Sequence, residues 1–341
     1  MGGGRRSSRS TPSDSSRSET YSAETPASQI GSVRAVSQTE PSASHIEALA
    51  ERAARPLSAS PRPFLRWAGS KRMLLRQFVD AIPATYGTYR EPFVGGGSLF
   101  FLLRPKRAAL SDSCADLIAT YEAVRDNCAA VLRYLAPLRP DRDLFYEIRS
   151  NRSGGRYKRA AEFIYLNKTC WNGLYRVNGD GEFNVPYGAP KTDNIIDPFN
   201  LRACAAAIRR PGVRFEVADF EGALLAAVPG DFVFLDPPYV TRHNNNGFVD
   251  YNELIFSWDD QLRVAAAANR LAAEGVNVLV TNAFHRDVLE LYDGFNVRPL
   301  DRPSTIAASA SKRGAVTEAL LWATQSVSVN GAKGSGRRGN G

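Results

Sequence analysis

The stretch Asp236-Pro237-Pro238-Tyr239 places an acid, two prolines and an aromatic ring directly after the apolar run 232–235. The prolines restrict the backbone, so the Asp236 carboxylate and the Pro237 carbonyl are expected to face outward together. Two adjacent acceptors suit an amine with two hydrogens, and each hydrogen bond to a charged acceptor contributes about 1.5–3 kcal/mol. Tyr239 adds a flat face for stacking a base. Taken as the catalytic group, these four residues predict chemistry at an exocyclic amine, although Pro-Pro pairs are also common in strand-terminating turns.

A second candidate site follows the predicted strand 89–92, where three glycines from Gly95 to Gly97 precede a helical pattern. Without side chains, a backbone turn can approach a nucleotide-like ligand closely. A complete dinucleotide fingerprint needs glycine where Phe100 stands, which disfavours a nicotinamide dehydrogenase. Asp112 ends the next apolar run, where an acid can accept a ribose hydroxyl or cap the following helix.

The elements that must position these residues alternate between short apolar runs and helical patterns, which predicts an α/β fold with parallel strands and crossover helices. In a doubly wound sheet, ligands bind beyond the carboxyl ends of the strands. Polar residues such as Asp219 and Asn282 follow the apolar runs, so we expect them to converge on one site. The predicted strands are 89–92, 108–111, 214–218, 232–235, 276–280 and 319–322.

The middle of the chain carries two alternating runs around the turn 178–181, a strong signal for a β-hairpin that can enter a DNA groove. Basic, aromatic and amide side chains in and before this hairpin suit phosphates, stacking and base edges. A solvated hairpin with a core tryptophan is the alternative interpretation. The side chains concerned are Lys168, Trp171, Asn172 and Arg176.

Composition and charge narrow the class of protein. The 341 residues have a net charge of +8, which favours an anionic partner. The four cysteines are scattered, without the spacing of a metal site, and indicate reduced thiols in a cytoplasm. No apolar run is long enough to span a membrane. These features predict an intracellular protein with neither a metal nor a membrane segment.

The two ends of the chain differ in composition from its middle. Residues 1–61 are rich in Ser, Arg, Thr, Pro and Ala, which predicts disorder with at most a short helix at 46–54. An organelle transit peptide is an alternative, but the acids of this region, among them Glu19 and Glu24, count against it. Residues 326–341 are Gly-rich and basic, which is typical of a flexible tail.

Five blocks of the sequence, in order, resemble the Dam-type (alpha-group) site-specific DNA adenine-N6 methyltransferases. Five blocks in register are specific where each alone is not. The resemblance covers about 63–324 of the chain. The blocks are FLRWAGSKRMLL from Phe64, YREPFVGGGSLFF from Tyr89, LSDSCADLIATYEAV from Leu110, FIYLNKTCWNGLYRVNGDGEFNVPYG from Phe163, and DPPY at Asp236.

The resemblance implies a Rossmann-like S-adenosylmethionine-dependent methyltransferase sheet formed by residues 62–127 and 205–325. It implies that 128–204 is an inserted, mainly helical target-recognition domain that carries the hairpin. The implied partner is double-stranded DNA, bound by a monomer or by two molecules per site in the cytoplasm, on the nucleoid. A cognate restriction endonuclease is compatible with the resemblance but has no signal in this chain.

Cofactor residues are carried over from the family motifs. Asp112 resembles the acid that accepts the ribose of S-adenosylmethionine, and Asp219 resembles the acid that receives its adenine amine. Ser70 stands where the family often has a second glycine, and the block after Asp112 lacks a common asparagine, which puts fine cofactor contacts in doubt. The implied cofactor residues are Trp67, Gly69, Lys71, Glu91, Pro92, Phe93, Gly95, Gly97, Asp112, Asp219 and Asp236.

DNA contacts are implied in the same way. Arg176 resembles the residue that reads a guanine, Leu174 and Pro186 those that touch neighbouring bases, and Trp171 and Asn172 those that fill the gap left by a flipped base. The NGLYRVN match suggests a GATC-like site. The implied DNA-binding residues are Arg66, Lys168, Trp171, Asn172, Leu174, Arg176 and Pro186.

The expected reaction is direct in-line attack by the N6 of a flipped-out adenine on the cofactor methyl group, with no metal. The polar run after Val240 is expected to form a loop that closes over the base, followed by a helix from about Asp259. Three alternatives remain open: a cytosine-N4 methyltransferase, an RNA adenine methyltransferase and a noncatalytic DNA-binding regulator. The leading Asp236 favours adenine, and the intact Pro237 and Tyr239 favour an enzyme.

Overall fold

The structure is a computed structural model that describes residues 43–54, 61–67, 71, 74–240, 256–303 and 315–324. The chain divides into two units, 1–36 and 37–341, and the described residues all belong to the second. The predicted tail at 326–341 and the loop after Val240, up to residue 255, lie outside the described residues. Within the predicted tail at 1–61, helix α1 (Ala43–Ala54) contains the short helix predicted at 46–54.

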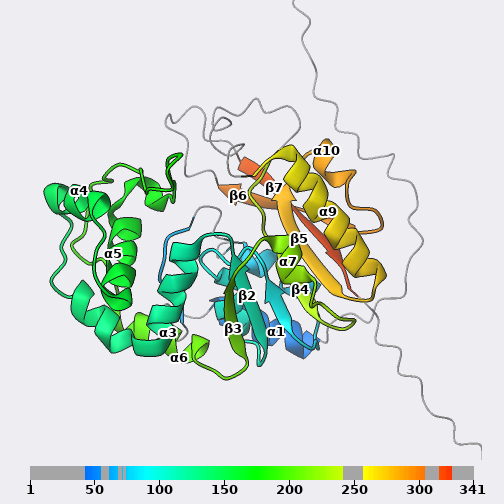
Figure 1. Ribbon diagram of the computed structural model, residues 1–341. Coiled ribbons are helices and arrows are strands. Elements are labelled where there is room, and N and C mark those ends of the chain that lie inside the picture. The colour runs from blue at the N-terminus through cyan, green and yellow to red at the C-terminus, as the bar shows by residue number, and fades with distance from the viewer. Residues whose placement is uncertain are drawn as a thin grey trace, which may run out of the picture. The chain divides into compact units, whose positions relative to one another are not determined.

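Seven strands form one sheet in the order β3-β2-β1-β4-β5-β7-β6 (Figure 1). The first five run parallel, and β7 runs antiparallel to both β5 and β6. After β1 the chain adds β2 and β3 on one side of that strand and then β4 and β5 on the other, so the strand order reverses between β1 and β4. Ligands bind at such a point in open α/β sheets. The predicted α/β class is confirmed. The strands are Tyr89–Glu91, Ala108–Asp112, Val213–Val217, Phe232–Leu235, Asn277–Ala283, Asn296–Pro303 and Ala315–Ala323, for β1 to β7.

Helices cover both faces of this sheet, because successive strand residues point to opposite sides. Phe232 and Phe234 of β4 belong to one buried cluster, with residues of α2, α3, α5 and α6, while Val233 and Leu235 belong to a second cluster with residues of α7, α9 and α10. The sheet is therefore doubly wound. The helices are α2 Ser98–Leu103, α3 Ala115–Leu135, α4 Arg142–Ser150, α5 Arg156–Thr169, α6 Pro198–Ile208, α7 Phe220–Leu224, α9 Trp258–Ala273 and α10 Arg286–Leu289.

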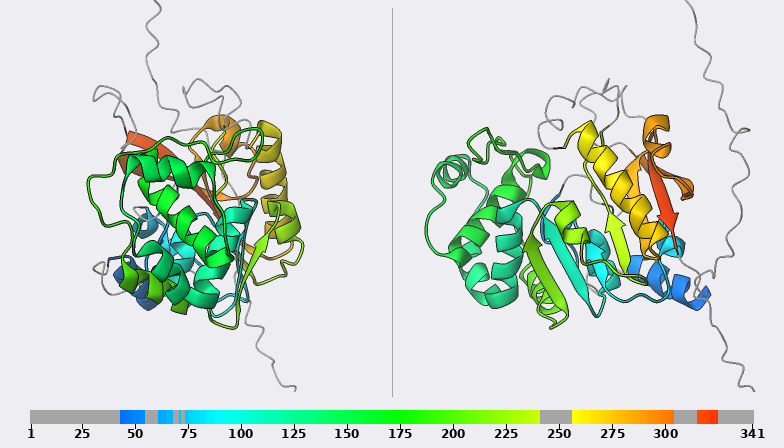
Figure 2. Two further views of the ribbon diagram at one scale, coloured as in Figure 1. Left: turned by 60° about the vertical axis from the view of Figure 1, so that its left-hand side comes forward. Right: turned by 45° about the vertical axis from the view of Figure 1, so that its right-hand side comes forward.

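A group of helices extends the molecule on the β3 side of the sheet, away from β6 and β7 (Figures 1 and 2). Helix α3 is kinked at Asn127, whose φ of −149° and ψ of 76° are not helical. The side chain of Asn127 accepts a hydrogen bond from the Ala130 N–H at 2.9 Å and so starts the second half of the helix. The predicted domain boundary after residue 127 falls at this kink, and the division itself stays a prediction.

Two parts of the chain differ from the predicted elements. Strand β6 is absent from the prediction because Pro299 and Pro303 interrupt its sequence, and proline is confined to edge positions in sheets. In the predicted hairpin, the Asn178 N–H donates to the Glu182 carbonyl at 2.8 Å, but the backbone forms only isolated bridges and no strand pair among the described residues. The hairpin is thus a turn with loosely paired arms.

Helix α9 begins close to the predicted residue, at Trp258, for a local reason. Ser257 and Asp260 form a capping box, in which each side chain bonds the other residue's backbone N–H. Among the described residues, no helix is long and apolar enough to cross a membrane.

Candidate active site and DNA interface

Asp236 follows β4 directly and lies next to the point where the strand order reverses. Its Oδ1 accepts a hydrogen bond from Thr281 Oγ1 at 2.7 Å and forms an ion pair with Lys71 Nζ at 2.7 Å. Thr281 belongs to β5, the neighbouring parallel strand, whereas Lys71 comes from the chain before β1. Three separate segments therefore meet at one carboxylate oxygen.

The second oxygen of this carboxylate is differently placed. Within the described part of the chain, every hydrogen bond and ion pair of the Asp236 side chain reaches Oδ1, including a long 3.5 Å contact with the Tyr239 hydroxyl. The side chain is 20% exposed. Oδ2 is thus an acceptor that the described residues leave open, on a carboxylate whose orientation Thr281 and Lys71 fix.

Burial raises the pKa of Asp236 above its ordinary value, while the ammonium of Lys71 and the hydrogen bonds from Lys71 and Thr281 oppose that rise. The charge of Glu318 adds to the increase. An ionised carboxylate is the stronger acceptor for an amine hydrogen, so Lys71 favours the form of Asp236 that can bind an amine.

Tyr239 is held by an acid that sequence reasoning missed. Its hydroxyl donates to Glu318 Oε2 at 2.7 Å, and Lys71 Nζ lies 4.8 Å from the centre of its ring. Lys71 also lies 3.6 Å from Glu318, and both side chains are 3% exposed. We call Lys71, Asp236, Tyr239, Thr281 and Glu318 the strand-end cluster.

The glycine loop after β1 is shaped around Trp67. Gly95 has a φ of 43°, and a Cβ added there would lie 2.6 Å from Trp67 Cδ1. The Gly95 N–H donates to Asp112 Oδ2 at 3.1 Å, and its carbonyl accepts from the Tyr121 hydroxyl at 2.9 Å. Gly97, with a φ of 66°, precedes α2. Only glycine fits this backbone beneath the indole ring.

Asp112 joins the glycine loop to the start of α3. Its Oδ1 accepts from the Cys114 N–H at 3.0 Å, so both oxygens contact backbone N–H groups at the end of β2. Burial raises the pKa of Asp112, and the hydrogen bonds from Cys114 and Gly95 oppose the rise. Asp112 does not cap α3 itself, since Cys114 occupies that position.

Glu91 lies inside the fold, at 2% exposure, where it accepts a hydrogen bond from the Tyr89 hydroxyl at 2.9 Å. Burial raises the pKa of Glu91 well above its ordinary value, and the charges of Asp236 and Asp112 raise it further. The three acids are thus close enough to interact. Pro92 and Phe93 follow Glu91, and Pro92 is buried.

Asp219 caps α7 at the end of β3. Its Oδ1 accepts from the Glu221 N–H at 3.0 Å and pairs with Arg263 at 3.0 Å. As at Asp236, the contacts of this carboxylate within the described residues use one oxygen, and its side chain is 55% exposed. The next residue, Phe220, stacks on Phe93 with ring centres 5.3 Å apart. An acceptor beside aromatic rings suits the amine of a purine.

The predicted DNA-contacting residues lie in and around the 168–187 segment. The side chain of Asn167 holds Arg66 from both sides, accepting from its N–H at 2.8 Å and donating to its carbonyl at 2.6 Å. Arg66 is exposed, and Lys168 is half-buried. Burial lowers the pKa of Lys168 to about 8, and the nearby charge of Arg66 contributes.

Close backbone contacts join the two arms of this segment near its exposed residues. The Trp171 N–H donates to the Pro186 carbonyl at 2.9 Å, and a Cβ on Gly188 would lie 2.5 Å from the Cys170 carbonyl. Trp171 is 46% exposed. Asn172 has a φ of 54° and is exposed, and Leu174 is half-buried. The two arms therefore approach each other closely where the predicted base-contacting residues lie.

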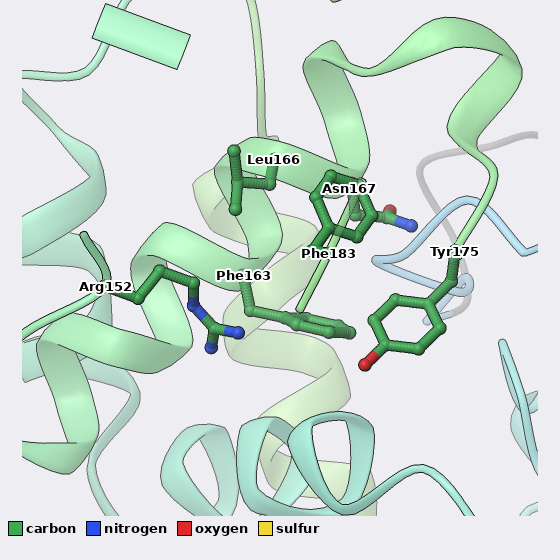
Figure 3. Close-up of a pocket in the computed structure, with 6 residues that line it drawn as sticks. All are labelled: Arg152, Phe163, Leu166, Asn167, Tyr175 and Phe183. Atoms are coloured by element: carbon green, nitrogen blue, oxygen red, sulfur yellow. The ribbon is translucent and has the colours of Figure 1, made fainter. Parts of the chain in front are cut away.

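Aromatic side chains attach the 168–187 segment to the rest of the protein. Tyr175 stacks on Trp67 with ring centres 5.5 Å apart and an interplanar angle of 18°. Figure 3 shows Tyr175 and Phe183 beside Phe163 of α5, with the Arg152 guanidinium on the other side of Phe163. Tyr175 therefore touches the residue that covers the glycine loop as well as the helical part.

Arg176, the predicted guanine reader, is held within the same segment. Its Nε donates to Asn184 Oδ1 at 2.5 Å, and its Nη2 donates to the Asn184 carbonyl at 3.4 Å. The side chain is half-buried. Its guanidinium plane is thus oriented before any base is bound.

Several site residues escaped sequence reasoning because their partners are distant in the chain. Glu318 has a visible signal, a lone acid in the apolar run of β7, whereas Thr281 and Asn167 have none. Gly69, a predicted cofactor residue, lies outside the described residues. No group of three or more His, Cys, Asp and Glu in the described part of the chain is arranged to hold a metal ion.

Comparison with known proteins identifies what this arrangement resembles. Residues 67–306 match the family model described as D12 class N6 adenine-specific DNA methyltransferase. The type II methyltransferase M1.LlaDCHI of Lactococcus lactis subsp. cremoris is 34% identical over 268 residues, which is 76% of this chain and 94% of the relative.

Two further relatives come from distant organisms. The type II methyltransferase M.MjaIII of Methanocaldococcus jannaschii is 34% identical over 276 residues, covering 74% of this chain and 95% of its own length. A DNA adenine methylase of Vibrio cholerae serotype O1 is 30% identical over 274 residues, covering 78% of this chain and 98% of its own length. The matched region contains the strand-end cluster except for Glu318, as well as the 168–187 segment.

Proposed function

Because the chain belongs to the D12 class N6 adenine-specific DNA methyltransferases, an S-adenosylmethionine-dependent family, we propose that it methylates an adenine flipped out of duplex DNA at a short, GATC-like site. We further propose that residues 236–239 orient the adenine amine. Duplex DNA is the substrate class of the family. A monomer is the proposed acting form, and a search of the neighbouring genes would test for a cognate endonuclease.

The residues around the glycine loop fit the cofactor. A side chain at Gly95 would collide with Trp67, so this backbone is kept bare. Carboxylates at Asp112 and Asp219 supply acceptors for hydroxyls and an amine, and Phe93 offers a flat apolar surface. When bound, S-adenosylmethionine supplies an electrophilic methyl group. Trp67, Asp112 and Asp219 would hold it, with Lys71 near the reacting end.

The observation that carries the proposal is the geometry of Asp236. Its Oδ1 is held by Lys71 and Thr281, while Oδ2 is left open within the described residues. An adenine amine donating one hydrogen to Oδ2 and the other to the Pro237 carbonyl would keep the nitrogen lone pair directed away from both acceptors. Tyr239, half-buried and tethered by its hydroxyl, would stack on the base.

The base must leave the helix for this contact. Flipping costs a few kcal/mol, which stacking and hydrogen bonding at the pocket offset. Trp171 and Asn172 would fill the space that the base leaves, and the exposure of both side chains supports this role. Arg176 would read a guanine with its oriented guanidinium, since a bidentate contact of this kind distinguishes bases by about 1–3 kcal/mol.

The test is methyl transfer from isotopically labelled S-adenosylmethionine to unmethylated duplex DNA, with the nucleosides resolved by mass spectrometry. We expect label in N6-methyladenine from the wild type. Asp236→Ala should lower the rate at least about 100-fold, the loss seen when one preorganised electrostatic contact to a reacting group is removed. Asp287→Ala, which changes a half-buried acid of α10, is the matched control and should retain activity.

Other outcomes would redirect the assignment. Label in N4-methylcytosine would transfer the reaction to cytosine with the same mechanism. Label in RNA but not in duplex DNA would change the substrate. A wild type that binds DNA and transfers no label to a varied set of sequences would contradict the proposed activity.

A further inference from the structure

Glu318 occupies a position in β7 where the neighbouring side chains Ala319, Leu320 and Leu321 are all buried. Glu318 is itself 2% exposed. Removing a carboxylate from water costs several kcal/mol unless partners compensate for the lost hydration. An apolar side chain would fill this strand position at lower cost, so the acid needs a reason beyond packing.

The register of the sheet places Glu318 beside the end of β5 and the middle of β6. It lies opposite Ala283, the last residue of β5, and opposite Leu300 of β6. Thr281, which donates to Asp236, is two residues before Ala283 on the same strand. The antiparallel extension of the sheet thus delivers one acid to the end of the parallel strands, where Asp236 lies.

Glu318 contacts the proposed reacting centre indirectly, through Tyr239 and Lys71. Its Oε2 accepts the Tyr239 hydroxyl at 2.7 Å and lies 3.6 Å from Lys71 Nζ. Each of these partners contacts Asp236, Lys71 at 2.7 Å and Tyr239 at 3.5 Å. Glu318 therefore touches two groups that in turn touch the carboxylate proposed to bind the amine.

These contacts restrict both partners. The hydrogen bond to Glu318 fixes where the far end of the Tyr239 ring lies, and Lys71 Nζ, 4.8 Å from the ring centre, restricts rotation of the ring about its own axis. Lys71 lies over the Tyr239 ring and is shared between two carboxylates, which prevents its long side chain from turning away from Asp236. Fixing reacting groups in one geometry is worth much in catalysis, since a 1 Å misplacement can cost about 100-fold in rate.

We propose that Glu318 is a positioning residue of the methyl transfer, which fixes the position of the Tyr239 ring and holds Lys71 against Asp236. This inference rests on the proposed function. Glu318 does not contact the adenine. It acts through Tyr239, on which the base would stack, and through Lys71, which orients the acceptor.

The negative charge of Glu318 matters as well as its shape. Glutamine at this position keeps an oxygen that can accept from Tyr239 but loses the charge that shares Lys71. The groups that face Asp236 are Lys71, Thr281, Tyr239 and Glu318, with Glu91 farther away. Because the charge of Glu318 raises the pKa of Asp236, its removal should move the acid limb of the kcat profile to lower pH.

The kinetic test compares the wild type with Glu318→Gln, Tyr239→Phe and the double variant. We expect kcat to fall roughly 10- to 100-fold in each single variant, with the Kd values for DNA and for S-adenosylmethionine within about twofold of the wild type. The double variant should lose little more than either single one, because both changes break the same contact. Glu290→Gln, which changes the exposed acid directly after α10, is the control and should leave kcat unchanged.

Three kinetic results would overturn the positioning role. They are an unchanged kcat in Glu318→Gln, a loss confined to cofactor or DNA affinity, and losses that simply multiply in the double variant. An acid limb that stays in place would contradict the electrostatic part. Glu318→Gln is isosteric, and its thermal unfolding should be measured beside the kinetics so that a folding defect is recognised.

A measurement without turnover separates this inference from the proposed function. In protein with ¹³C at the tyrosine ζ carbons, the signal that disappears in Tyr239→Phe belongs to Tyr239, and it reports the hydrogen bond of the hydroxyl. We expect this signal to shift in Glu318→Gln and to stay in place in Glu290→Gln. If the Tyr239 signal is the same in the wild type and in Glu318→Gln, the contact is refuted even when the wild type is active. If the signal shifts but the wild type transfers no methyl group, the contact is established and the proposed activity is wrong.

Discussion

At the strand-end cluster, Lys71 and Glu318 are 3% exposed and charged groups meet at 2.7 Å, whereas in the 168–187 segment Trp171 is 46% exposed and the backbone forms only isolated bridges. The first region is fixed by strands that end side by side. The second is fixed by single anchors, such as Tyr175 on Trp67 and on Phe163. Hydrogen bonds between neighbouring strands make the first region stiff, and the fewer anchors of the second leave it more adaptable to a partner.

This difference suits the two tasks that we propose, methyl transfer at the strand-end cluster and DNA recognition by the 168–187 segment. A reaction requires preorganised charges, which the protein maintains at the cost of burying them. Recognition of DNA requires exposed side chains that reach phosphates and base edges. The comparison therefore predicts that substitutions near the strand ends act on rate and cofactor binding, while those in the 168–187 segment act on DNA affinity and on discrimination between sequences.

Gly95→Ala should produce the largest effect among the tests that follow, because the loop has no room for a methyl group. The new Cβ would lie 2.6 Å from Trp67 in a left-handed backbone. We expect a cost of about 1–3 kcal/mol, measured as a loss of roughly 5- to 150-fold in S-adenosylmethionine affinity by calorimetry. Gly96→Ala, whose Cβ meets only ordinary contacts at 3.5 Å or more, is the control. Equal losses in both variants would show that the loop is not shaped by Trp67.

Arg176→Ala should change specificity with little effect on the chemistry. Loss of a bidentate guanine contact reduces discrimination by about 1–3 kcal/mol, so kcat/KM for the cognate site should approach that of sites altered at one base pair. Competition between cognate and altered duplexes in one reaction measures the ratio directly. Arg270→Ala, on α9 and paired with Glu274, should leave the ratio unchanged. If Arg176→Ala lowered activity on all sequences equally, the residue would position the DNA backbone.

Lys168 should give the smallest effect, a change of DNA affinity with pH. Its pKa is lowered to about 8, so the ammonium loses its proton as the pH rises from 7 to 9, and affinity for duplex DNA should fall about two- to fivefold. The stability of the fold should change in the opposite direction. Between pH 8 and the higher pKa of an unfolded lysine, the unfolded chain binds more protons, so stability rises with pH.

Fluorescence anisotropy of labelled duplex at pH 7 and 9, at constant salt, measures the affinity change. In Lys168→Met the difference between the two pH values should shrink. An undiminished pH dependence in that variant would assign the effect to another group and remove Lys168 from the interface.

The sequence predicted the acids at the ends of the parallel strands better than the backbone pairing of the 168–187 segment, for a physical reason. Asp112, Asp219 and Asp236 each follow a short apolar run, and parallel strands bring such ends together whatever their separation in the chain. The same reasoning does not find Glu318, because β7 is antiparallel to β5. The first part of β7, not its carboxyl end, therefore lies beside the carboxyl ends of the parallel strands. A lone acid in an apolar strand was the available signal.

The turn at 178–181 was predicted correctly, yet its arms do not form a ladder. Arg176 and Asn184 use their side chains to bond across the arms, and the isolated bridges are separated along the chain. Periodicity reports which residues alternate, but not whether backbone pairing continues. For β6 the prediction erred in the other direction, because Pro299 made the sequence look unlike a strand. The structure nevertheless pairs β6 with β7 along the whole length of β6.

The stack of Tyr175 on Trp67 limits how this enzyme can be re-engineered. Exchanging the 168–187 segment for that of a relative would be the direct route to a new target sequence. The incoming segment must also bring an aromatic ring to position 175, because Trp67 shelters the glycine loop on one side and rests on that ring on the other. A chimera that ignores this contact exchanges the proposed reader of the DNA and, with it, the support of Trp67 over the proposed cofactor loop.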